Sequence, residues 1–167
     1  RMVLLDAIKK EIIDPGNATV LAPDIGSAAI SQAYAKRLGT HFALIDKRRY
    51  APNRAVVSHL IGDLNGKDVL IIDDMIDTAG TTVNAAKAAE KRGAKSVTAI
   101  ATHGVLSGPA LDCLNKSNIR KIIITDTINT KNKNMLSNME IVTVAEVFGA
   151  AIKRIHNNES VSSLFEF

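Results

Sequence analysis

The chain has 167 residues, a length that suits one compact domain over residues 1–167. Hydrophobic residues make up 46% of it and charged residues 23%, a balance that excludes intrinsic disorder and favours an ordinary packed core. Aromatic residues make up only 4% and tryptophan is absent, so Ile, Val, Leu and Ala must fill that core, which favours an α/β layer structure.

The formal net charge is +4, but the basic residues are spread along the chain with few aromatic residues among them, so we expect no nucleic-acid partner. Their densest cluster, Lys47-Arg48-Arg49, suits a small anionic ligand. Cys113 is the only cysteine, which excludes an intrachain disulfide framework and favours a reducing compartment. No run approaches the roughly 20 apolar residues of a membrane span, and no signal-peptide pattern is present. We therefore expect no membrane partner and a cytoplasmic location.

Apolar periodicity and turn residues predict alternating helices and strands. In chain order these are a helix at 3–13, a strand at 18–22, a helix at 27–38, strands at 41–45, 56–61 and 68–72, a helix at 81–92, a strand at 96–101, a helix at 109–115, strands at 121–125 and 140–144, and a helix at 145–156. Ser107-Gly108-Pro109 is typical of a helix start, with Ser or Gly as the N-cap. The polar residues 126–138 predict an exposed connection. The alternation predicts a three-layer α/β fold, with a mainly parallel sheet flanked by helices.

Three aspartates follow the most apolar stretch of the chain, VLIIDDMIDTAGT at residues 69–81. Asp73 begins the exit from the predicted strand, and ligands of open α/β sheets bind outside the carboxyl ends of the strands. The small residues 78–82 lead into a helix, whose free backbone N–H groups and positive dipole end suit phosphate. Because adjacent carboxylates accept hydrogen bonds from vicinal hydroxyls or bind a metal, the stretch predicts a phosphorylated-sugar site. The alternative is that Asp73 and Asp74 only end a strand and Thr81 caps a helix.

Other candidate residues have an ordinary structural interpretation beside the functional one. Residues 23–27, PDIGS, lie at another predicted strand-to-helix junction and by themselves indicate only a turn. The basic cluster at 47–49 suits a solvated turn, although its place before Pro52-Asn53 also suits a mobile lid. The histidines at 41, 59, 103 and 156 show no metal-ligand spacing, and we expect each to be structural.

VLIIDDMIDTAGT resembles the phosphoribosyl-pyrophosphate motif of type I phosphoribosyltransferases. Three further stretches, APDIGSAA at 22–29, ALIDKRRYAPN at 43–53 and ESVSSLF at 159–165, narrow the resemblance to the ribose-phosphate pyrophosphokinases. The match runs along essentially the whole chain, but only to the C-terminal half of that two-domain family. The resemblance implies a type I phosphoribosyltransferase-like fold. It also implies an activity that transfers a diphosphoryl group from ATP to ribose 5-phosphate with Mg²⁺, giving 5-phosphoribosyl 1-diphosphate and AMP.

The resemblance implies a role for each residue that matches the family's motifs. Asp73 and Asp74 would meet the ribose hydroxyls. The 5-phosphate would be held by the turn made of Asp77, Thr78, Ala79, Gly80 and Thr81. A pyrophosphate-binding loop would be made of Asp24, Ile25, Gly26 and Ser27, with Asp24 contributing to a Mg²⁺ site.

Two more groups of residues gain a role only through the resemblance. Lys47 and Arg49 would be the catalytic cations of a mobile loop. Ser160, Ser162 and Phe165 would contribute to an allosteric site between the subunits of a homo-oligomer, whereas a frayed tail is the other interpretation of this segment.

The family's adenine-binding residues belong to its other domain, so the ATP site of this chain is expected to be incomplete. We predict that the isolated chain binds ribose 5-phosphate without turning it over. Two alternatives stay open. One is a phosphoribosyltransferase that consumes 5-phosphoribosyl 1-diphosphate, for which the chain offers no base-binding hood. The other is a noncatalytic regulatory or interaction subunit that keeps the fold.

Overall fold

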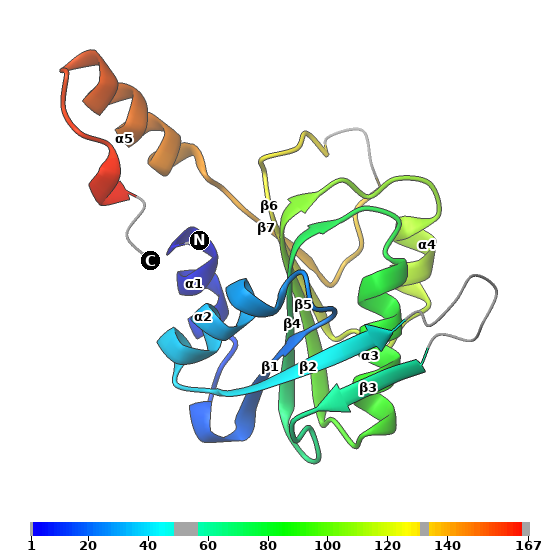
Figure 1. Cartoon of the computed structure of the whole chain (residues 1–167). Helices are drawn as coiled ribbons and strands as arrows, with labels where there is room; N and C mark the ends of the chain where they lie inside the picture. Colours follow the sequence, from blue (N-terminus) through cyan, green and yellow to red (C-terminus); the bar gives the residue numbers. More distant parts are fainter. Residues whose placement is uncertain (1, 49–56, 131–133, 165–167) are drawn as a thin grey trace.

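A computed structural model describes residues 2–48, 57–130 and 134–164 (Figure 1). Within these ranges seven strands form one sheet in the order β3-β2-β1-β4-β5-β6-β7. The strands are β1 (Ala18–Ala22), β2 (His41–Arg48), β3 (Val57–Ile61), β4 (Asp68–Ile76), β5 (Ser96–Gly104), β6 (Lys121–Thr125) and β7 (Met139–Val142). The β2–β3 pair is antiparallel and the other neighbouring pairs are parallel. The predicted, mainly parallel sheet is confirmed.

Helices cover both faces of this sheet (Figure 1). On one face α1 (Met2–Lys9) and α2 (Ala28–Leu38) pack over a cluster that contains Leu5, Ile8 and Ile72. On the other, α3 (Gly80–Lys91) and α4 (Ala110–Asn115) pack over a second cluster, in which small buried alanines of α3 let the helix approach the sheet closely. Burying the sheet between two helical layers removes its apolar strands from water, and the predicted three-layer α/β fold is confirmed.

The last helix, α5 (Ala145–His156), extends from the end of β7 away from the sheet (Figure 1). None of its residues is buried, and Phe148, Ile152 and Ile155 are exposed along it. The short 3-10 turn η2 (Ser162–Leu164) follows it, as the 3-10 turn η1 (Pro15–Asn17) precedes β1.

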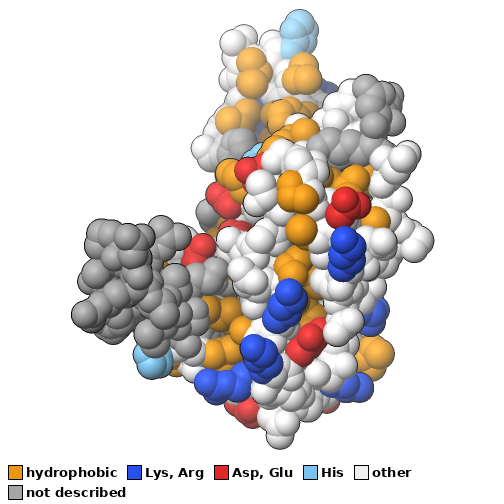
Figure 2. All heavy atoms as spheres, turned by 90° about the vertical axis from the view of Figure 1, so that its right-hand side faces the viewer, with side chains coloured by type: hydrophobic (Ala, Val, Ile, Leu, Met, Phe, Trp, Pro, Cys, Tyr) orange, Lys and Arg blue, Asp and Glu red, His pale blue; other side chains and the backbone are white. Residues whose placement is uncertain are grey.

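The side of the molecule that carries α3 and α4 has a broken band of hydrophobic side chains down its middle (Figure 2). Lys and Arg side chains lie on both sides of the lower half of this band, with Asp and Glu side chains between them. The cations on this face are therefore dispersed. No helix in the described part of the chain combines the length and the apolarity needed to cross a membrane.

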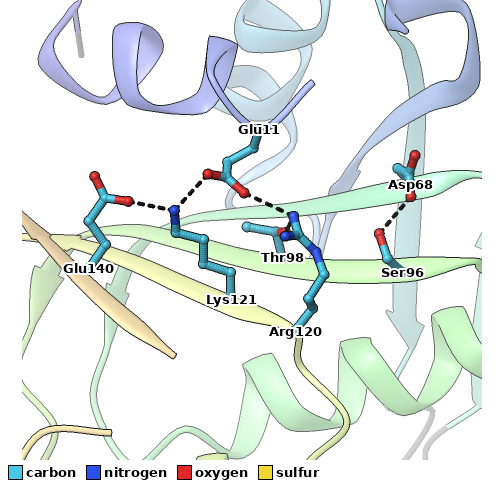
Figure 3. A network of polar contacts seen from close by, with 7 residues as sticks. All are labelled: Glu11, Asp68, Ser96, Thr98, Arg120, Lys121 and Glu140. Carbon is cyan, nitrogen blue, oxygen red and sulfur yellow. Dashed lines mark hydrogen bonds and ion pairs between the residues drawn. The ribbon is translucent and has the colours of Figure 1, made fainter. Parts of the chain in front are cut away.

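An ion-pair network fixes the edge of the sheet where the strands begin (Figure 3). The Glu11 carboxylate forms ion pairs with Lys121 Nζ at 2.6 Å and with Arg120 Nη2 at 2.9 Å. Lys121 also pairs with Glu140 at 2.6 Å. Burial alone would raise the pKa of Glu11, but the hydrogen bonds from Lys121 and Arg120 outweigh it and lower that pKa.

This network explains why the first helix is shorter than predicted. The periodicity predicted a helix at 3–13, whereas α1 ends at Lys9, and Glu11 lies in the turn that follows, where its carboxylate contacts β6. Ile13 is 98% exposed, so the apolar pattern of the helix does not continue to it. The prediction of the helix end was wrong because a long-range ion pair decides where the chain turns.

Candidate functional site

The strand β4 continues past the end of its neighbour β1. The candidate site lies where β4 extends beyond β1. The pairing of β1 with β4 reaches Leu21↔Ile71, whereas β4 pairs with β5 as far as Ile76↔Gly104. The prediction that Asp73 and Asp74 follow the strand was therefore wrong, because β5 supplies partners that prolong it. Beyond Ala22 the chain turns toward α2, so one side of Asp73 and Asp74 lacks the neighbouring β1 strand and is open to a ligand.

Three aspartates share two adjoining hollows at this edge. One hollow, of about 280 Å³, is lined by Asp24, Gly26, Ser27, Ile30, Asp73 and Asp74. The other, of about 200 Å³, is lined by Asp24, Asp73, Asp74, Met75, Ile76, Asp77, Thr78, Ala79, Thr81 and Thr82. The structure thus brings together residues that lie about fifty positions apart in the sequence. Asp24 was predicted to belong to a pyrophosphate loop and a Mg²⁺ site, and Asp73 and Asp74 were predicted to meet the ribose hydroxyls.

The carboxyl group of Asp73 has a raised pKa. Burial raises its pKa to about 6, and the nearby charges of Asp24 and Asp74 act in the same direction. The backbone N–H of Asp74 donates to Asp73 Oδ1 at 3.0 Å and opposes the rise. A half-buried carboxylate beside two others is stabilised by hydroxyl donors or a cation, so the electrostatics favour a polyhydroxylated or metal-bound ligand.

The turn between β1 and α2 is closed by its own side chains. Asp24 Oδ1 accepts hydrogen bonds from Ser27 N at 3.0 Å and from Ser27 Oγ at 3.2 Å. One helical turn on, Ser31 Oγ donates to the carbonyl of Ile72 at 3.1 Å and ties α2 to β4. Ile25 is 60% exposed and does not line the hollows, so of the predicted loop Asp24, Gly26 and Ser27 reach the site.

The turn between β4 and α3 uses an unusual backbone conformation. Ala79, the residue before α3, has a φ of 65°, a left-handed conformation that is uncommon for a residue other than glycine. No side chain caps α3, and the backbone N–H groups of its first turn have no partner within the helix. Asp77, Thr78, Ala79 and Thr81 line the smaller hollow, whereas Gly80 begins the helix behind it. Donors at a helix N-terminus next to a hollow suit a phosphate group.

The three aspartates offer oxygen ligands but no complete metal cage. Within the described ranges, no three His, Cys, Asp or Glu side chains are grouped closely enough to hold a metal ion by themselves. Mg²⁺ usually takes only one or two protein carboxylates and completes its coordination with water and substrate phosphates. Asp24, Asp73 and Asp74 therefore fit Mg²⁺ when it arrives with a phosphorylated ligand.

The remaining predicted residues are not joined to this site by the described coordinates. The backbone of Lys47 lies in β2 opposite Ser58, but its side chain, like all of Arg49 and Phe165, lies outside the described residues. Ser160 and Ser162 contact each other, with Oγ–Oγ at 3.1 Å, and Arg154 of α5 donates to the carbonyl of Ser160. Their segment lies beside α5, apart from the sheet (Figure 1).

Ile30, Met75 and Ile76 line the hollows without having been predicted to do so, and the contact of Ser107 with the site from outside the hollows was also not predicted. Ile30 lies one helical turn beyond Ser27, so helical periodicity was a signal that could have placed it at the same hollow. Met75 lies two positions beyond Asp73 and would have been found if β4 had been predicted at its full length. Ser107 contacts Asp77 from a different loop, and no local pattern in the sequence indicates this contact.

The fold places the chain in a class, the proteins with a type I phosphoribosyltransferase-like α/β fold. A purine phosphoribosyltransferase from Pyrococcus horikoshii Ot3 shares the fold, with a TM-score of 0.52 at 16% identity over 85% of this chain and 77% of that chain. The family model described as the phosphoribosyl synthetase-associated domain matches residues 49–166. The chain belongs to the phosphoribosyl synthetase-associated domain family.

Individual relatives agree with this assignment. The chain is 46% identical to a ribose-phosphate pyrophosphokinase of Chlorobaculum tepidum over 99% of its own length, and 44% identical to one of Aquifex aeolicus over 98%. It superposes on a phosphoribosylpyrophosphate synthetase from Mycobacterium smegmatis with a TM-score of 0.85 at 30% identity over 93% of its length. It spans only 50%, 52% and 50% of these three relatives. The predicted resemblance is confirmed, and that the match is to the C-terminal half stays a prediction.

Proposed function

We propose that this chain provides the ribose 5-phosphate site of a ribose-phosphate pyrophosphokinase. The observation that carries the proposal is the convergence of Asp24, Asp73 and Asp74 with the turn at 77–81 on two adjoining hollows. A sugar phosphate needs acceptors for its hydroxyls at one end and donors for its phosphate at the other. Both sets are present here within a few residues, in a chain of the matching family.

In the proposed complex the site works by positioning its ligand. Asp73 and Asp74 accept hydrogen bonds from the ribose hydroxyls and thereby orient the C1 hydroxyl, while the turn at 77–81 anchors the 5-phosphate. Fixing both ends of the sugar turns an encounter between two substrates into a reaction between aligned groups. With a pKa of about 6, Asp73 is mostly ionised at neutral pH and accepts these bonds as a carboxylate.

The remaining parts of the reaction belong to the same proposal. ATP is the second substrate, and its diphosphoryl group passes to the C1 hydroxyl to give 5-phosphoribosyl 1-diphosphate and AMP. Mg²⁺, held in part by Asp24, would neutralise charge on the phosphates. Asp24, Gly26 and Ser27 would receive the diphosphate, and Lys47 and Arg49 would stabilise the charge that develops during transfer. The proposal has three further parts. They are a homo-oligomeric assembly, a cytoplasmic location, and a regulatory site that includes Ser160, Ser162 and Phe165.

The direct test is isothermal titration of the chain with ribose 5-phosphate. We expect saturable binding at one site per chain and no binding of glucose 6-phosphate at the same concentrations, because the spacing of hydroxyls and phosphate differs. Absence of ribose 5-phosphate binding would refute the proposal.

A second assay separates binding from catalysis. The chain is incubated with ribose 5-phosphate, ATP and Mg²⁺, and AMP is measured. We expect none from the 167-residue chain, because it spans about half of the relatives that carry the activity in their names. Release of AMP together with 5-phosphoribosyl 1-diphosphate would show that this half is sufficient.

A further inference from the structure

The segment that follows β5 runs alongside the proposed phosphate turn. Leu106 N donates to the carbonyl of Ile76 at 3.0 Å, and Ser107 N donates to the carbonyl of Asp77 at 3.0 Å. These bonds continue the contact between β4 and β5 beyond its last strand pair, Ile76↔Gly104. The support segment, residues 105–108, therefore lies against the start of the turn that follows β4.

Ser107 adds a side-chain bond to the backbone bond on the same residue. Its hydroxyl donates to Asp77 Oδ1, so both the carbonyl and the carboxylate of Asp77 are held from the support segment. The sequence had suggested Ser107 or Gly108 as the N-cap of the following helix. That prediction was wrong: Pro109 precedes α4 with no side-chain cap, and the Ser107 hydroxyl is used on Asp77.

The two segments share a second feature, a buried residue in a left-handed conformation. Ala79 has a φ of 65° and Leu106 a φ of 51°, and each is only 3% exposed within the same apolar cluster. Such conformations persist where surrounding contacts hold them, and they are concentrated at ligand-binding turns. Asp77 lies two residues before Ala79, so contacts that fix Asp77 restrict the path of the chain into Ala79 and the first turn of α3.

We propose that Ser107 is a positioning residue that holds the turn at 77–81 in its phosphate-accepting conformation by bonding Asp77. This inference rests on the proposed sugar-phosphate site. It means that Ser107, a residue outside the turn, keeps the backbone N–H donors of the turn in place. Ser107 itself does not line either hollow, so its effect on a ligand passes through Asp77.

The test compares ribose 5-phosphate binding by the full 167-residue chain and by three variants, using titration calorimetry. Ser107→Ala removes the side-chain bond and is expected to weaken binding roughly tenfold, the usual effect of losing one hydrogen bond to a charged group. Ser107→Thr keeps a hydroxyl and is expected to restore affinity to within about threefold of the original chain. Ser117→Ala is the matched control, because Ser117 is also half-buried and its Oγ donates to Leu114 O at the other end of α4.

The amide resonances of Thr78, Gly80 and Thr81 provide a readout that a general loss of stability would not move. In Ser107→Ala these resonances are expected to shift in the ligand-free chain, whereas those of α2 are not. A cycle with Asp77→Ala adds a second comparison: the double variant should bind no more weakly than Asp77→Ala alone. Additive losses would overturn the inference.

The outcomes separate the inference from the function on which it rests. If the original chain fails to bind ribose 5-phosphate, the proposed function fails and the role of Ser107 falls with it. If the original chain binds and Ser107→Ala binds within twofold of it, the proposed function stands and the positioning role is refuted. Equal losses in Ser107→Ala and Ser117→Ala would also refute it, because they would show a general structural effect.

Discussion

The two strand-to-helix turns at the carboxyl edge of the sheet are held in different ways. The β1–α2 turn is closed locally, because Asp24 accepts both of its side-chain hydrogen bonds from Ser27, three residues later. The β4–α3 turn is held from a distance, because Asp77 is bonded by Ser107, thirty residues later. The first turn therefore carries its own support, whereas the second depends on a neighbouring strand end.

This difference has a functional meaning in the proposed site. A self-closed turn presents Asp24 in a conformation that does not depend on the ligand. The β4–α3 turn presents the first backbone N–H groups of α3, which no side chain caps, beside the smaller hollow, and such donors suit a phosphate. The comparison predicts that ribose 5-phosphate affinity depends mainly on the β4–α3 side, and that changes in the β1–α2 turn act first on folding.

The largest effect is expected for Asp73→Asn. Replacing the carboxylate would weaken the hydrogen bonds that we propose with the ribose hydroxyls, so affinity for ribose 5-phosphate should fall about 100-fold, or about 2.7 kcal/mol. The measurement is titration calorimetry at pH 7.5 in buffer without Mg²⁺.

Asp24→Asn is the matched control from the other turn. An asparagine keeps an oxygen that can accept from Ser27 N, so without Mg²⁺ the affinity should change less than about threefold. Equal losses in the two variants would contradict the division of roles between the turns.

Gly80→Val should weaken binding about tenfold by crowding the start of α3 where the phosphate is proposed to sit. A Cβ at Gly80 would meet no atom closer than Thr78 Oγ1 at 3.9 Å, so the ligand-free fold accommodates it. The free energy of unfolding, measured by thermal unfolding, should therefore change by less than about 1 kcal/mol. Gly149→Val on the exposed α5, where a Cβ meets nothing within 4 Å, is the control and should leave the affinity unchanged.

The sequence was sufficient where local patterns decide the structure. The alternation of strands and helices and the three layers followed from apolar periodicity and from turn residues. The contact between Asp24 and Ser27 also lies within a short local motif. Such features are encoded by residues only a few positions apart.

The sequence was insufficient where the structure depends on distant partners. The end of β4 is set by β5, the end of α1 is set by the ion pairs of Glu11 with Arg120 and Lys121, and the hydroxyl of Ser107 is used on Asp77 and not on its own helix. Each of these contacts joins residues about thirty or more positions apart, and the periodicity of apolar residues does not predict such contacts. The resemblance to a family suggested the ligand that we propose, but it did not reveal which contacts hold the turn.

Asp73→Asn should also stabilise the ligand-free chain at neutral pH. The pKa of Asp73 is about 6 in the folded chain and lies near 3.9 in an unfolded one, so the folded chain binds more protons between these values. The free energy of unfolding of the original chain therefore falls as the pH rises from about 4 to about 6. Above about pH 6 the destabilisation by ionised Asp73 is fully present. With a discount for solvent screening of a half-exposed group, the variant should be about 1 kcal/mol more stable at pH 7.5.

Urea unfolding at pH 7.5 and near pH 3.5 checks this sign. The gain should nearly vanish at the lower pH, where Asp73 is protonated in the folded chain and mostly protonated in the unfolded one. Asp6→Asn, at an exposed position on α1, gives the background effect of removing one negative charge. A gain of equal size at both pH values would mean that packing, and not the raised pKa, favours the amide.

The smallest effect concerns Gly26→Ala in the β1–α2 turn. A Cβ there would lie 3.3 Å from Asp24 Oδ1, tighter than ordinary contact, and would disturb the oxygen that accepts from Ser27. The free energy of unfolding should fall by about 0.5 kcal/mol, while affinity for ribose 5-phosphate without Mg²⁺ stays within about twofold. Gly16→Ala is a matched control, because its Cβ would lie at the same 3.3 Å from Asp14 Oδ1 at the opposite edge of the sheet. If Gly26→Ala instead lowers affinity and Gly16→Ala does not, the β1–α2 turn also contacts the sugar phosphate, and the two turns form one continuous binding surface.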